Sequence, residues 1–69
     1  MELKIELDQE NDGRWIAEVV DLPGVMVYGG TRAEALIRVK SLALHVIADR
    51  LAANEIVVED PISFSPIAA

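Results

Sequence analysis

Apolar and polar residues alternate at the start of the chain. Leu3, Ile5 and Leu7 are separated by charged residues, and this period of two is typical of a β-strand with one face in water. The polar segment 9–13 follows and ends in Asp12-Gly13, a pair that suits a hairpin turn. The pattern therefore predicts a first strand and a turn that leads back along it.

The second apolar run, residues 14–20, is apolar on both of its faces. Such a strand is predicted to lie inside the sheet, with a neighbour on each side and a cover on at least one face. Pro23-Gly24 then predicts a turn, because proline sets one backbone dihedral and glycine tolerates a positive one. The next apolar run, 25–28, follows so closely that we expect an antiparallel neighbour. Residues 1–28 therefore predict a three-stranded antiparallel meander.

A long helix is predicted to begin at Arg32. The preceding pair Gly29-Gly30 gives the backbone freedom, and Thr31 with Glu34 three residues later has the spacing of a capping box, in which each side chain satisfies a backbone N–H. The helix is expected to end near Asn54, since asparagine accepts the left-handed conformation that ends helices.

The last part of the chain predicts a connector and one short strand. Residues 55–60 form the connector, and residues 62–65 alternate again between Pro61 and Pro66. Because proline cannot donate to a sheet ladder, this strand is predicted to lie at an edge. The predicted fold class is α+β, a single domain over residues 1–69 with a three-stranded antiparallel meander, one long helix on the sheet and a short C-terminal edge strand.

The helix carries more apolar surface than one sheet face needs. The side predicted to cover the sheet consists of Leu36, Val39, Leu42, Ala43, Val46 and Ile47. Further round lie Ile37, Leu44, Ala48 and Leu51. We interpret this second group as an interface with another copy or with a different protein. The alternative is that the last segment of the chain folds back over it.

Charge and composition narrow the function. The chain has 12 acidic and 6 basic residues, a net charge of −6, and the basic residues are scattered, which argues against a nucleic-acid surface. An acidic surface favours a basic partner or serves solubility alone. There is no cysteine and one histidine, which excludes disulfides and an imidazole-rich metal site. At 69 residues a single core is only marginally stabilising, and association with other chains would support it.

The N-terminal residues lack the basic start and apolar run of a signal peptide, and no stretch reaches the length of a membrane span. The sequence therefore predicts a cytoplasmic location.

Candidate chemistry is sparse. Gly29-Gly30-Thr31 at a helix start could attract an anion, but the lysine and glycine spacing of a phosphate loop are absent, so we interpret these residues as a capped turn. His45 and Asp49 are four residues apart and can pair on the helix surface. No nucleophile is placed beside them by spacing, and a solvated pair is the favoured interpretation.

An acidic cluster could in principle bind a divalent cation. Its members are Glu6, Asp8, Glu10 and Asp12. They alternate along a strand and into a flexible turn, which suits a wet sheet face better than a closed cage of oxygen ligands. Trp15, the one tryptophan, fits either a core position or a binding hot spot. We therefore predict no metal and no cofactor.

Three motifs together resemble the HicB-type antitoxin domain of type II toxin–antitoxin systems. They are Gly13-Arg14-Trp15-Ile16-Ala17-Glu18, Asp21-Leu22-Pro23-Gly24, and Gly30-Thr31 followed by Glu34-Ala35-Leu36. The resemblance covers about residues 1–51. It implies a β-β-β-α-β domain described as a partly degraded ribonuclease-H-like fold. It also implies a protein without catalytic activity that binds and silences a small basic HicA-type toxin, an enzyme that cleaves messenger RNA. Many such antitoxins carry an additional DNA-binding segment, and the chain is expected to be a short form without one.

These observations predict an antitoxin-like module that binds a basic toxin through an acidic surface and self-associates through the helix. The expected partner-binding residues are Glu6, Asp8, Trp15, Glu18 and Asp21. The expected oligomer interface is Ile37, Leu44, Ala48 and Leu51, and the expected structural residues are Pro23, Gly24, Gly30, Thr31 and Glu34. The alternative is an orphan homo-oligomeric scaffold without a toxin partner. The least favoured candidate is a metal-dependent nuclease that would use Asp8 and Asp21.

Overall fold

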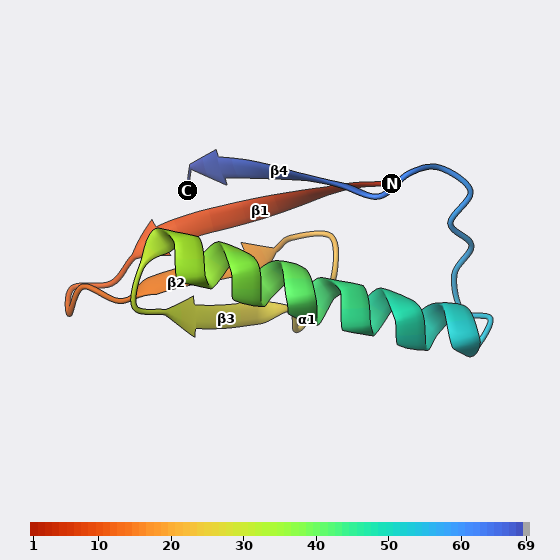
Figure 1. Cartoon of the computed structure of the whole chain (residues 1–69), viewed down its shortest axis with the longest axis horizontal. Coiled ribbons are helices and arrows are strands. Elements are labelled where there is room, and N and C mark those ends of the chain that lie inside the picture. The colour runs from red at the N-terminus through yellow and green to blue at the C-terminus, as the bar shows by residue number, and fades with distance from the viewer. Residues whose placement is uncertain (69) are drawn as a thin grey trace.

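The alternating and helical segments of the sequence form two layers. The computed structural model describes residues 1–68. Its elements follow the order β1 (Glu2–Gln9), β2 (Trp15–Val19), β3 (Met26–Gly29), α1 (Arg32–Ala52) and β4 (Ser63–Ala68). The strands form one sheet, and α1 lies across one face of it (Figure 1). The predicted β-β-β-α-β order and α+β class are confirmed.

The sheet has the strand order β3-β2-β1-β4. β1 pairs antiparallel with β2, with Ile5 opposite Val19, and β2 pairs antiparallel with β3, with Ala17 opposite Val27. The predicted meander and the central position of β2 are therefore confirmed. β4, however, pairs parallel to β1, so the sheet is mixed and not purely antiparallel.

The direction of β4 follows from the path of the chain before it. Beyond α1 the connector returns to the start of β1, where the Ser63 amide donates to the Met1 carbonyl at 2.8 Å and the Met1 ammonium donates to the Pro61 carbonyl at 2.8 Å. The two strands therefore begin side by side and run the same way (Figure 1). β4 also continues through Pro66, where the sequence predicted an end, because an edge strand tolerates a residue that cannot donate to the ladder.

The core lies between the sheet and α1. Its buried apolar residues are Leu3, Ile5, Leu7, Ala17, Val19, Leu22, Val25, Ala35, Val39, Ala43 and Ile47. The side of α1 that was predicted to cover the sheet does face it. The centre of that side consists of Ala35, Val39, Ala43 and Ile47, which lie four residues apart. Leu36, Leu42 and Val46 are half-buried on its flanks.

Both helix ends match the sequence prediction. The Thr31 hydroxyl accepts from the Glu34 amide at 3.0 Å, and the Glu34 carboxylate accepts from the Gly30 amide at 3.3 Å. That second bond reaches one residue before the N-cap, in contrast to the usual capping box. At the other end Asn54 adopts a φ of 57°, the left-handed conformation expected of it.

Candidate protein-binding surfaces

The face of the sheet opposite α1 is open to solvent within the described residues. Successive residues of a strand point to opposite faces, so the side chains that alternate with the buried core residues lie on this open sheet face. From β1 it receives Glu2, Lys4, Glu6 and Asp8. From β2 and the following residue it receives Ile16, Glu18 and Val20, and from β3 Met26 and Tyr28.

Three of the predicted partner-binding carboxylates meet at the centre of this face. Glu6 lies opposite Glu18, and Asp8 lies opposite Ile16. The four side chains line a shallow hollow of about 150 Å³. The hollow therefore has acidic walls and one apolar residue, a combination that suits the charged head and aliphatic stem of a lysine or an arginine.

Exposed apolar side chains surround the acidic centre. Val20 and Met26 are 43% and 49% exposed. Tyr28 is exposed as well, and the guanidinium of Arg14 lies over its ring at 4.7 Å from the centroid. The sequence predicted that β2 is apolar on both faces. It did not predict that Met26 and Tyr28 of β3 lie on the same open face, because that depends on the pairing register of β2 and β3.

The other two predicted partner residues lie elsewhere. Trp15 belongs to the face that α1 covers, is half-buried against the core, and lines a cleft of about 350 Å³ beside Arg32. Asp21 has a structural contact, because its Oδ2 accepts from the Lys4 amide at 3.1 Å and so continues the bonding between β1 and the chain after β2. The predicted partner-binding residues are therefore not one surface. Glu6, Asp8 and Glu18 share the open sheet face, whereas Trp15 lies on the covered face and Asp21 lies beyond the end of β2.

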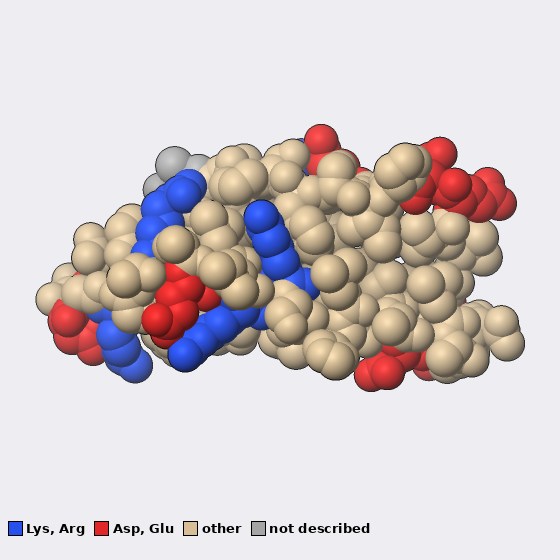
Figure 2. All heavy atoms as spheres, in the orientation of Figure 1, with Lys and Arg blue, Asp and Glu red and all other residues tan. Residues whose placement is uncertain are grey.

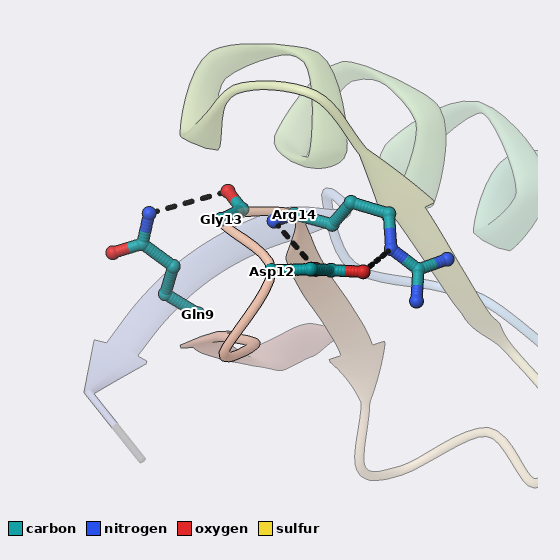
Figure 3. Close-up of polar contacts among 4 residues, drawn as sticks. All are labelled: Gln9, Asp12, Gly13 and Arg14. Atoms are coloured by element: carbon teal, nitrogen blue, oxygen red, sulfur yellow. Dashed lines mark hydrogen bonds and ion pairs between the residues drawn. The ribbon is translucent and has the colours of Figure 1, made fainter.

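The acidic cluster of the first hairpin is divided as well. Asp12 bonds within the hairpin turn: its Oδ1 accepts from the Arg14 amide at 3.1 Å and its Oδ2 pairs with Arg14 Nε at 2.7 Å (Figure 3). The hydrogen bond from the Arg14 backbone, with that of its side chain, lowers the pKa of Asp12 below its ordinary value, against a smaller opposing effect of desolvation. Gln9 Nε2 donates to the Gly13 carbonyl at 3.2 Å in the same turn (Figure 3).

No group of three or more His, Cys, Asp or Glu side chains within residues 1–68 is arranged to hold a metal ion. His45 and Asp49 are both exposed on α1, and no hydrogen bond joins these two side chains. No helix of the described chain combines the length and the apolar character needed to cross a membrane.

The second candidate surface is the outer side of α1. Ile37, Leu44 and Leu51 are 70%, 46% and 41% exposed, and Ala48 is exposed with them. The prediction that this group lies outside the core is confirmed. The alternative, that the last segment covers it, is wrong for residues 53–68, which lead away to pair with β1 at the far edge of the sheet (Figure 1).

The glycines of the predicted structural set have different tasks. Gly24 has a φ of +84°, which the turn after Pro23 requires. Gly29 and Gly30 are not in the left-handed region. Gly29 instead allows a close approach, because a Cβ placed there would lie 2.5 Å from the Ala35 backbone nitrogen. Sequence reasoning assigned this pair to backbone freedom and missed the contact with α1.

The side chain of Arg38 was also missed by sequence reasoning. It pairs with Glu34 at 2.8 Å and donates to the Tyr28 carbonyl at 2.9 Å, which occupies a backbone acceptor on the outer edge strand β3. The four-residue spacing from Glu34 could have indicated the ion pair, but not the bond to Tyr28.

Comparison with known proteins gives no relative: no family model, no curated protein and no solved structure matches the chain.

Proposed function

We propose that the chain is an antitoxin-like protein-binding module that neutralises a small, basic, RNA-cleaving toxin of the HicA type. The observation that carries the proposal is the acidic centre of the open sheet face, Glu6, Asp8 and Glu18, bordered by exposed apolar side chains. The resemblance of the sequence motifs to HicB-type antitoxins supports the identity of the partner. The proposal assigns the chain no reaction and no cofactor.

Charge on the open sheet face explains how the chain would silence such a toxin. A toxin that cleaves RNA needs basic side chains to bind phosphates. Carboxylates fixed on a rigid sheet can pair with those side chains and compete with the RNA, while the exposed apolar side chains beside them add buried apolar area to the contact. The net charge of −6 also steers a basic protein toward the chain.

An orphan homo-oligomeric scaffold is the second candidate, favoured by the uncovered apolar side of α1. A magnesium-dependent nuclease is disfavoured by geometry. The Asp21 carboxylate lies at Lys4, whereas Asp8 is four residues further along β1, about 13 Å at the rise of a strand. These two carboxylates therefore do not meet at one ion.

The test identifies an adjacent gene that encodes a small basic protein, mixes its product with the purified chain, and measures complex formation and RNA cleavage; the absence of such a gene would count against the proposal. The double variant Glu6→Lys/Glu18→Lys is expected to weaken the complex at least about tenfold, on the order of 1.4 kcal/mol, and to restore cleavage. The matched control, Glu55→Lys/Glu59→Lys, makes the same change of charge in the exposed connector and should leave binding nearly unchanged. If both double variants weakened binding equally, the interaction would depend on net charge alone and not on the open sheet face. A wild-type chain that neither binds the protein nor stops cleavage would refute the proposal.

A further inference from the structure

The outer side of α1 has a regular spacing that its exposure alone does not explain. Ile37, Ser41, Leu44, Ala48 and Leu51 are separated by four, three, four and three residues, which is the spacing of the contact positions in a coiled coil. All five are exposed. We call this row the outer seam; it extends for about 21 Å at the rise of an α-helix.

Large and small residues alternate along the outer seam. Between Leu44 and its neighbours lies a hollow of about 280 Å³, lined by Ser41, Leu44, His45 and Ala48. These residues have the spacing i, i+3, i+4 and i+7, which is the four-residue hole that receives a side chain from a facing helix in knobs-into-holes packing. The seam thus presents both knobs and a hole.

We propose that the outer seam pairs with the outer seam of a second copy of this chain, with the two helices antiparallel. A twofold axis midway between Ser41 and Leu44 would relate the copies, make the contact isologous and place Leu44 of each copy opposite Ser41 of the other. Large residues of each copy would then face the small residues of the other, so that the helices approach closely. This inference does not depend on the proposed function, because it concerns the opposite side of the molecule.

The alternation of sizes favours the antiparallel orientation. In a parallel twofold pair each residue meets its own copy, so Leu44 would meet Leu44 and Ala48 would meet Ala48. The leucines would hold the helices apart and leave voids at the small residues, which close packing disfavours. In an antiparallel pair about an axis between Ser41 and Leu44, each leucine at position 44 lies opposite a serine, and Ile37 lies opposite Ala48, so large and small residues complement each other.

Charge favours a second copy over a different partner at this surface. The chain as a whole carries −6, so self-contact through the open sheet face would bring its carboxylates together. Beside the outer seam the charges balance: Glu34 and Arg38 form an ion pair at 2.8 Å, and Lys40 and Asp49 flank the seam with opposite signs. Most of the surface on the α1 side is neither acidic nor basic (Figure 2). The charges beside the outer seam therefore add no local repulsion between two copies.

The first test measures mass against concentration by light scattering and sedimentation. The wild-type chain should change with concentration from 7.5 kDa toward twice that mass. Leu44→Glu should remain at the monomer mass. Ser41→Leu should weaken the dimer although it adds apolar surface, because it fills the space that close approach requires. Val57→Glu, at a residue 78% exposed in the connector, is the matched control and should behave like the wild type.

The second test fixes the orientation, using the absence of cysteine from the sequence. Ile37→Cys and Leu51→Cys chains are mixed and treated with a short thiol cross-linker. The two variants should cross-link to each other, because Ile37 of one copy lies opposite Ala48 of the other and within one helical turn of its Leu51. Ile37→Cys alone should not cross-link, since its copies would lie about 17 Å apart along the helix. A wild-type chain that stays monomeric at high concentration, a Ser41→Leu chain that dimerises more tightly, or self-linked Ile37→Cys would each overturn the proposal.

Discussion

Gly29 lies where β3 ends and α1 begins, and its missing side chain determines how closely the two elements approach. A Cβ at this position would lie 2.5 Å from the nitrogen and 2.9 Å from the Cα of Ala35. Both are backbone atoms of a helix packed on the core, so neither can move without moving α1. Gly29→Ala is therefore expected to lower the free energy of unfolding by about 1–3 kcal/mol, the usual cost of overpacking.

Gly30 is the matched control for this substitution. A Cβ there would meet only the Glu34 side chain, at 3.9 Å, so Gly30→Ala should change stability by less than about 0.5 kcal/mol or raise it slightly. Urea unfolding followed by circular dichroism measures both variants. Equal losses would show that backbone conformation, rather than the contact with Ala35, governs the pair.

The residues that could be predicted are those whose role depends on near neighbours in the chain. Thr31 and Glu34 bond within the first helical turn, and Asn54 ends the helix by its own conformation, so their spacing was sufficient. Gly29 and Asp21 act on residues that only folding brings near, Ala35 across the layers and Lys4 on another strand. No local pattern contains those contacts.

At the scale of elements, the start of α1 depends on one side-chain bond. The Thr31 hydroxyl satisfies the Glu34 amide, which has no partner within the helix. Thr31→Ala should cost about 1 kcal/mol of stability, measured as a lower urea midpoint with an unchanged slope. Thr31→Ser keeps the hydroxyl and should retain most of that stability. If serine and alanine prove equally destabilising, the threonine methyl packing and not the cap would be responsible.

The meander and helix could be read from sequence because their signals are local: alternation, turn pairs and a cap. The direction of β4 could not, because an edge strand after a long connector can align either way. The direction depends on where the connector delivers the chain, and here Ser63 and Pro61 bond at Met1. The same return path leaves the outer side of α1 uncovered. This decides against cover by the last segment of the chain and leaves the outer side free for an interface.

On the scale of the whole molecule, charge and apolar area are divided between opposite sides. The open sheet face concentrates carboxylates at its centre, and the α1 side carries the exposed apolar row with balanced charges beside it. A two-layer fold keeps these sides apart because the core lies between them (Figure 1). The two proposed contacts should therefore be energetically independent, as expected for sites without shared residues.

This independence gives a prediction for the assembled complex. A dimer joined through the outer seam would expose two open sheet faces and bind two basic partners. Leu44→Glu should halve the mass of the complex measured by light scattering but leave the partner affinity per chain within about twofold, well under 1.4 kcal/mol. Conversely, Glu6→Lys/Glu18→Lys should lose the partner and keep the dimer. If Leu44→Glu also abolished partner binding while its circular dichroism matched the wild type, the partner would contact α1, and the assignment of the two surfaces would have to be exchanged or merged.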